Sequence, residues 1–298
     1  MYYGYEFIEV KKKGNKGKNL LLILLVLIAI GGAIYTGIKT AEYANERKIE
    51  EARVKKQELQ KEQKRIEEEK RQQEELKNSK DLTQEQIQAI ENIYASEEKR
   101  VFLTFDDGPT TAVTPYILDL LKQENIKATF FVLGNRAKAN PDLIKREFNE
   151  GHYIANHGYT HKYSSIYTNA QTVLEEYNYT EQCIQEALAN PNYHSRIFRF
   201  PGGSVGGYYK TIKKEAKKYL RDNNIASLDW NSLTKDAEGA HTKETLLENA
   251  ITTMDNKNSV VILMHDAADK ILTYETLPSL IQYLRENGYE FKNLYDII

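Results

Sequence analysis

From about residue 98 to residue 298, short apolar runs alternate with longer amphipathic segments, and this alternation restricts the fold more than any other feature. Six apolar runs predict buried strands, at residues 100–105, 127–133, 151–157, 195–200, 224–230 and 259–266. The segments between or after them predict helices, at residues 113–125, 140–150, 169–189, 207–223, 242–256 and 274–287. Such alternation is typical of an α/β fold with a parallel sheet, and about 200 residues allow six to eight strand–helix units.

Residues 19–38 form a continuous apolar stretch without any charged side chain. Its length matches a helix that crosses the hydrocarbon core of a bilayer. Five lysines lie within residues 11–18, so the positive-inside rule places residues 1–18 in the cytoplasm and the bulk of the chain outside. A cleaved signal peptide is the alternative, but the run is long for one and no clear A-x-A cleavage site follows it. We therefore predict an uncleaved, single-pass membrane anchor.

Residues 41–80 are dominated by Glu, Lys, Arg and Gln, and residues 46–75 contain neither Gly nor Pro. Opposite charges at i, i+4, such as Glu51 with Lys55, favour an exposed helix. We predict a solvated helical stalk, with a flexible charged linker as the alternative. A coiled coil, and self-association through it, has weak support because polar residues would also fall on the seam.

The net charge argues against nucleic-acid binding, and the cysteine content excludes an intrachain disulfide. The formal net charge is −2, and no basic face of the kind that a nucleic-acid-binding protein needs is evident. The single cysteine, Cys183, excludes an intrachain disulfide, and its helical surroundings predict a small buried apolar side chain.

Residues with chemically useful side chains gather where the predicted strands end. They are Asp106, Asp107, His157, Arg199, Asp229, His265 and Asp266. The carboxyl ends of parallel strands meet at one edge of the sheet, where α/β folds build their sites. We therefore predict an active site at this edge of the sheet.

His157 and His161 are four residues apart, a spacing that can aim two imidazoles at one point. With a carboxylate from a neighbouring strand they would make a two-His, one-Asp metal site with open positions for water and substrate. Asp106 and Asp107 are adjacent at a strand end, so their side chains point in opposite directions. One carboxylate can bind the metal while the other faces the water.

Five segments then occur in a specific order: TFDDGP, HGYTH, RFPGG, the Asp-Trp of SLDWN, and LMHD, spread over residues 104–266. With this combination the domain resembles the polysaccharide deacetylases of the NodB-homology type, carbohydrate esterase family 4. The resemblance covers about two-thirds of the chain, without the anchor and stalk. It implies a distorted (β/α) barrel with about seven strands.

The resemblance also implies roles around a metal. Asp106 corresponds to the general base, held by Arg199. Asp107, His157 and His161 correspond to ligands of a divalent metal. This donor set favours zinc, with nickel or cobalt as alternatives.

The remaining implied roles concern the leaving group and the substrate. His265 corresponds to the general acid, and Asp229 to the carboxylate that keeps it protonated. Trp230 would line the cleft, and Leu263 would contribute to the pocket for the acetyl methyl group. The backbone N–H of Gly202 would donate to the developing oxyanion.

One departure from the family pattern bears on substrate preference. Many members have a tyrosine in the third motif, as in R-P-P-Y-G, where this sequence has RFPGG with Gly202. A backbone donor survives this change, but a side-chain wall of the cleft does not. Several tyrosines lie nearby in residues 158–170, either as a sugar-stacking rim or as ordinary surface aromatics.

Topology and motifs together predict an anchored, outward-facing enzyme that removes N-acetyl groups from N-acetylglucosamine of peptidoglycan, in a Gram-positive bacterium. A tethered domain on a stalk suits a fixed polymer near the membrane. The alternatives are an O-acetyl esterase on a xylan-type glycan and a chitin-oligosaccharide deacetylase. An inactive glycan-binding scaffold is disfavoured because the base, acid and ligand residues are all present.

Overall fold

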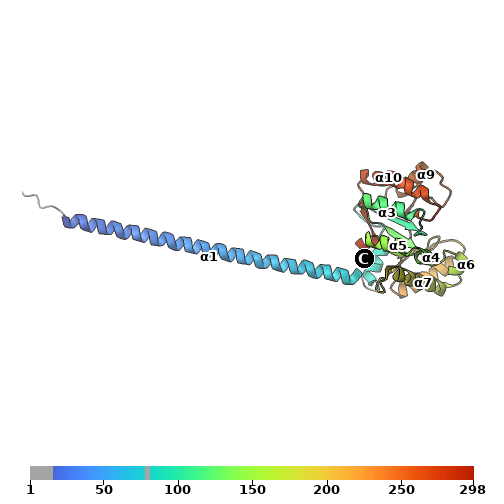
Figure 1. Ribbon diagram of the computed structural model, residues 1–298, viewed down its shortest axis with the longest axis horizontal. Helices are drawn as coiled ribbons and strands as arrows, with labels where there is room; N and C mark the ends of the chain where they lie inside the picture. The colour runs from blue at the N-terminus through green and yellow to red at the C-terminus, as the bar shows by residue number, and fades with distance from the viewer. Residues whose placement is uncertain (1–15, 78–80) are drawn as a thin grey trace, which may run out of the picture. The chain divides into compact units, whose positions relative to one another are not determined.

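The computed structural model of the protein describes residues 16–77 and 81–298. The chain divides into two compact units, Met1–Arg71 and Gln72–Ile298. Helix α1 (Lys16–Lys77) accounts for the described part of the first unit (Figure 1). It contains all of the predicted anchor and most of the predicted stalk, whereas most of the basic tail, residues 1–15, and stalk residues 78–80 lie outside the described residues. Its apolar part is long and apolar enough to cross a membrane, with a mean hydropathy of 2.6.

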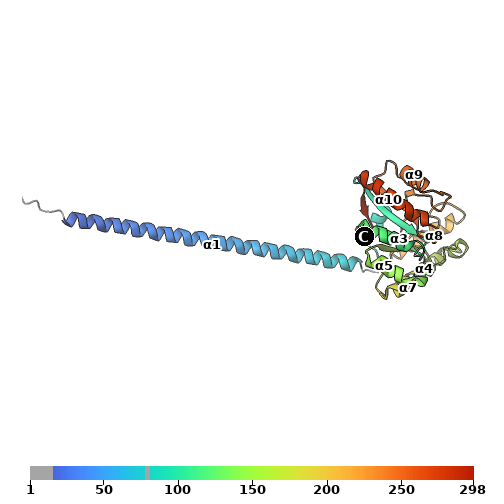
Figure 2. The same ribbon diagram turned by 45° about the horizontal axis from the view of Figure 1, so that its top comes forward.

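The second unit is built on a parallel sheet that curls into a half-barrel, as predicted (Figure 2). Its strands run in the order β5-β4-β3-β2-β1-β7-β6, and β8 pairs with β1. The bounds are β1 (Arg100–Asp106), β2 (Thr129–Val132), β3 (Tyr153–Asn156), β4 (Ile197–Phe198), β5 (Ala226–Ser227), β6 (Ser232–Leu233), β7 (Ser259–His265) and β8 (Glu290–Lys292). The two-residue strand β6 and strand β8 were not predicted from the sequence.

Strand β1 pairs with three other strands of the sheet. Strand β7 pairs with it along its whole length, from Arg100 to Asp106. On its other edge β8 pairs with residues 100–102 and β2 with residues 104–106. Every residue of β1 after Arg100 is buried, which explains its almost continuous apolar sequence.

Helices cover the sheet. They are α2 (Gln84–Glu91), α3 (Thr114–Gln123), α4 (Gly134–Ala139), α5 (Pro141–Asn149), α6 (Tyr163–Ile166), α7 (Ala170–Leu188), α8 (Lys210–Asp222), α9 (Lys243–Met254) and α10 (Ile271–Glu286), with a 3₁₀ turn at Leu294–Asp296. Contacts of α9 with α10, α10 with α3, α3 with α5, α5 with α7 and α7 with α8 join them into an outer layer. The six predicted helices are present, and Cys183 is buried in α7 as expected.

The folded domain begins upstream of residue 98, the boundary expected from the sequence. Leu82, Ile87, Ile90 and Ile93 are buried in the same cluster as Phe102 of β1. Thr83 starts α2 with a reciprocal capping box to Gln86, which satisfies N–H groups of the first turn. Residues 81–97 are therefore part of the domain rather than a linker to it.

Candidate active site

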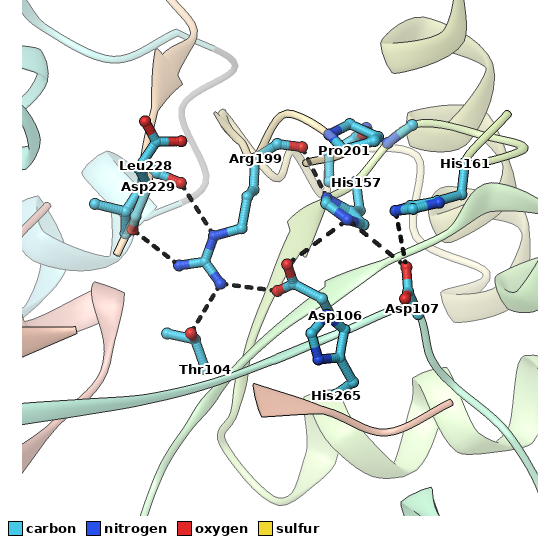
Figure 3. A network of polar contacts seen from close by, with 12 residues as sticks. Thr104, Asp106, Asp107, His157, His161, Arg199, Pro201, Leu228, Asp229 and His265 are labelled. Carbon is cyan, nitrogen blue, oxygen red and sulfur yellow. Dashed lines mark hydrogen bonds and ion pairs between the residues drawn. The ribbon is translucent and has the colours of Figure 1, made fainter. Parts of the chain in front are cut away.

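Asp106 and Arg199 form a buried ion pair at the carboxyl edge of the sheet (Figure 3). Asp106 is the last residue of β1, and Arg199 directly follows β4. Arg199 Nη1 donates to Asp106 Oδ1 at 2.8 Å, and both side chains are almost fully buried. Burial raises the pKa of Asp106, and the adjacent guanidinium opposes that rise.

The remaining donors of Arg199 fix its guanidinium in place. Nη1 also donates to the Thr104 hydroxyl at 2.8 Å, while Nε and Nη2 donate to the carbonyls of Leu228 and Asp229 at 3.1 Å each. The guanidinium stacks over the Phe131 ring at 3.8 Å. Arg199 therefore holds the Asp106 carboxylate in one orientation, which would suit a general base.

Asp107, His157 and His161 bring three donor atoms together beside this pair (Figure 3). Asp107 Oδ1 lies 3.7 Å from His157 Nε2 and 3.5 Å from His161 Nε2. That carboxylate oxygen is buried and has no hydrogen-bond partner among the described residues. A buried acceptor without a partner, facing two imidazole nitrogens, fits a divalent cation.

The orientation and protonation of His157, and the backbone of Asp107 and His161, also fit a metal site. His157 Nδ1 lies 2.8 Å from the carbonyl oxygen of Arg199, so its Nε2 faces the cluster. Burial lowers the pKa of His157 to about 3, and the neutral imidazole is the form that binds metals. Asp107 and His161 both have left-handed backbone, with φ of 75° and 57°. Non-glycine residues rarely adopt this conformation, and such backbone strain is often found at functional sites.

His265, the predicted acid, ends β7, but its partner is Asp236 rather than the predicted Asp229. His265 Nδ1 lies 2.8 Å from Asp236 Oδ1, and the His265 N–H donates to Asp236 Oδ2 at 2.8 Å. Burial opposes the charged imidazole, but Asp236, together with Asp106 and Asp107, outweighs it and raises the pKa of His265 to about 9. The reason is local: Asp236 follows β6, which pairs with β7, whereas the Asp229 carboxylate binds Ser204 instead of turning toward His265.

Asp229 instead fixes the turn that contains Gly202. Its carboxylate accepts from the Ser204 N–H at 2.9 Å and from the Ser204 hydroxyl at 2.5 Å. On the other side of the turn, the buried ammonium of Lys213 donates to the Gly203 carbonyl at 2.7 Å. The N–H of Gly202, the predicted oxyanion donor, is given no hydrogen-bond acceptor by the rest of the described chain.

The other predicted substrate contacts lie at the same edge. The partly buried Trp230 lies beside the turn, since a Cβ added to Gly203 would be 3.2 Å from its ring, and Arg199 lies 5.7 Å from the ring centroid. Leu263 lies two residues before His265 in β7, which places the two side chains on one face of the strand. Asp266 points elsewhere: its carboxylate accepts from the Thr114 hydroxyl at 2.5 Å, and burial raises its pKa to about 7.

A buried carboxylate with a fixed orientation, a metal-type donor cluster and a charged histidine are typical of hydrolases that attack with an activated water. The chain matches the family model for polysaccharide deacetylases over residues 94–221. It is 36% identical over 206 residues to a peptidoglycan-N-acetylglucosamine deacetylase of Bacillus cereus, with 67% of this chain and 71% of the relative covered. The chain therefore belongs to the polysaccharide deacetylase family, whose members are metal-dependent hydrolases.

Two further comparisons agree with this assignment. The peptidoglycan-N-acetylglucosamine deacetylase PgdA of Listeria monocytogenes is 32% identical over 203 residues, which are 68% of this chain but only 40% of that protein. The structure of a Streptococcus mutans CE4 esterase is similar with a TM-score of 0.62 and 31% identity, and the match covers 72% of this chain and 91% of the esterase.

Proposed function

We propose that this protein hydrolyses the N-acetyl group of N-acetylglucosamine in peptidoglycan. The observation that carries the proposal is the placement of the Asp106–Arg199 pair directly beside the donor cluster of Asp107, His157 and His161. His157 Nε2 lies 3.6 Å from Asp106 Oδ2, so base and cluster share one face of the site. The names of the Bacillus cereus and Listeria monocytogenes relatives support this glycan as substrate.

Amide hydrolysis needs an activated water, a donor to the oxyanion and a proton for the leaving amine. A divalent metal held by Asp107, His157 and His161, with zinc favoured over nickel or cobalt, would supply a bound water of lowered pKa and a polarised acetyl carbonyl. Asp106 accepts the proton of the attacking water, and Arg199 keeps its carboxylate aimed.

The 202–204 turn stabilises the oxyanion, and His265 protonates the leaving amine. The Gly202 N–H donates to the carbonyl oxygen as negative charge develops there. His265, with its pKa of about 9 and its Nδ1 bound to Asp236, donates a proton from Nε2 to the leaving nitrogen. Trp230 and Leu263 border the sugar and the acetyl methyl group.

Membrane attachment through α1 is part of the proposal. Residues 19–38 would span the bilayer, residues 1–18 would lie in the cytoplasm, and residues 41–80 would carry the domain outward to the wall. Fractionation of cells that express the full chain, followed by protease treatment of intact protoplasts, tests this. Full-length protein in the membrane fraction with a protease-accessible domain supports the anchor, and a shortened soluble product supports a cleaved signal.

Acetate release tests the activity. The full chain in detergent would be given peptidoglycan, N-acetylglucosamine oligomers and acetylated xylan, with and without chelator, beside Asp106→Asn. Chelator-sensitive release from peptidoglycan that Asp106→Asn lacks would support the proposal. Release from xylan alone would replace it with O-acetyl esterase activity.

A further inference from the structure

The space next to Gly202 is occupied by Tyr163, which comes from a different part of the chain. A Cβ added to Gly202 would lie 2.4 Å from the Tyr163 hydroxyl oxygen and 3.0 Å from its Cζ. No side chain fits at position 202 while this ring stays in place. Gly202 also has φ of 71°, a conformation that disfavours residues with a side chain. Gly202 and Tyr163 are therefore matched: the small residue leaves room for the ring.

Several neighbours hold the Tyr163 ring in position. Tyr163 begins α6, two residues after the donor His161, and the two ring centroids are 5.5 Å apart. The rings of Tyr167 and Tyr209 lie 5.8 and 6.5 Å away. Lys213 Nζ lies 6.0 Å from the centre of the Tyr163 ring and also binds the Gly203 carbonyl. The ring is thus fixed between the donor cluster and the turn that carries the Gly202 N–H.

Tyr167, a neighbouring tyrosine with a structural role, provides a comparison for Tyr163. It is 1% exposed, and its hydroxyl donates to the Pro201 carbonyl at 2.7 Å. Tyr163, one helical turn away, is 41% exposed, and its hydroxyl has no hydrogen bond to any residue that the structure describes. Packing and one hydrogen bond account for Tyr167, but they leave the hydroxyl of the partly exposed Tyr163 without a role.

We propose, as a consequence of the function proposed above, that Tyr163 is a specificity-determining residue that contacts the sugar ring bearing the acetyl group. Its ring supplies the side-chain wall that Gly202 lacks, and its hydroxyl hydrogen-bonds a sugar hydroxyl next to the scissile group. A hydroxyl can donate and accept, so it suits the hydroxyls of a hexosamine unit. The contact is to the sugar rather than to the acetyl group.

Binding without turnover provides the first test. Trp230 is the only tryptophan of the chain and lies against the 202–204 turn, so its fluorescence can report glycan binding there. N-acetylglucosamine oligomers would be titrated into the full chain carrying Asp106→Asn, with and without Tyr163→Phe. We expect Tyr163→Phe to weaken binding by about 3- to 10-fold, the effect of one lost hydrogen bond. Equal affinities would overturn the proposal, whereas no binding by Asp106→Asn itself would instead count against the glycan assignment.

Kinetics provide the second test. On the oligomers, Tyr163→Phe and Tyr163→Ala should raise KM, with Ala the larger effect, and Tyr163→Phe should lose more kcat/KM on the oligomers than on the sugar-free ester 4-nitrophenyl acetate. The matched control is Tyr219→Phe on α8, a partly exposed tyrosine outside the site. Unchanged KM on the oligomers, or equal losses on both substrates, would overturn the assignment to sugar recognition. Wild type that cleaves the ester but no glycan would refute the proposed function instead.

The matching of Gly202 with Tyr163 has a test of its own that does not depend on activity. Gly202→Ala should lower the melting temperature in the wild type, because of both the contact with Tyr163 and the positive φ. In a Tyr163→Ala background only the backbone cost remains, so the same change should lower the melting temperature less. Equal decreases in the two backgrounds would show that Tyr163 does not occupy the space at position 202.

Discussion

Asp236 accepts hydrogen bonds from both the ring and the backbone of His265. Its Oδ1 lies 2.8 Å from His265 Nδ1, its Oδ2 accepts from the His265 N–H at 2.8 Å, and the Thr273 hydroxyl adds a third bond at 2.7 Å. The carboxylate therefore fixes the orientation of the imidazole and favours its charged form.

Replacing Asp236 should move the alkaline limit of activity. The pKa of His265 is raised to about 9, so the protonated acid is present below that pH and is lost as the pH rises through it. In Asp236→Asn the burial of His265 is no longer offset by Asp236, and its pKa falls. We expect kcat to decrease by roughly 10²-fold or more and the alkaline limb of its pH profile to move to lower pH. An unmoved limb would contradict the role of Asp236.

Asp229→Asn separates the observed partner from the one expected from the sequence. Because the Asp229 carboxylate binds Ser204 and not His265, its loss should loosen the 202–204 turn. We expect KM for glycan to rise while the alkaline limb of the kcat profile stays in place. A shift of that limb like the one in Asp236→Asn would show that Asp229 acts on His265 after all.

Metal binding should depend on the donor cluster. Asp107→Ala and His161→Ala each remove one of three donors, so we expect metal affinity to decrease by at least about tenfold and activity to be lost in parallel. Elemental analysis of dialysed protein measures the bound metal, and readdition of zinc, nickel or cobalt identifies the one that restores activity. His241→Ala, an exposed histidine outside the cluster, is the control. Full metal content in both donor variants would refute the site.

Arg199 should matter for stability as well as for activity. Arg199→Met leaves the Asp106 carboxylate buried without its cation and removes donors from Thr104 and two carbonyls. Breaking a buried ion pair in this way costs about 3–5 kcal/mol in the free energy of unfolding. Arg199→Lys should recover little of the loss, because an ammonium cannot reproduce the fork of the guanidinium. Urea denaturation followed by circular dichroism measures both; wild-type stability of Arg199→Met would contradict the structure.

Long segments with a strong hydrophobic pattern are the parts of the structure that the sequence predicts best. The apolar runs of β1 and β7 are continuous and end in the polar residues of the site, so their pattern is sufficient to place Asp106 and His265 at one edge of the sheet. The two-residue strand β6 has no such pattern. Its pairing with β7 is what brings Asp236 to His265, and that register cannot be read from local sequence.

Two other features depend on contacts between distant segments. The motif itself shows that position 202 has no side chain. That the Tyr163 ring fills this space depends on how the loop after β3 packs against the turn after β4. The burial of Ile87, Ile90 and Ile93 depends on a cluster that includes Phe102 and Leu294. The alternation of apolar runs and amphipathic segments, which begins near residue 98, therefore predicts too late a start for the domain.

The contact between Asp106 and Arg199 also depends on the curvature of the sheet. Strands β1 and β4 are separated by β2 and β3, so in a flat sheet they would lie about 14 Å apart, at roughly 4.8 Å per strand. The Arg199 guanidinium reaches Asp106 Oδ1 at 2.8 Å because the length of its side chain and the curl of the sheet together span that separation. Any change that flattens the sheet would increase the separation of these strands and strain the contact between the Asp106 carboxylate and the Arg199 guanidinium, even if every residue of the site were unchanged.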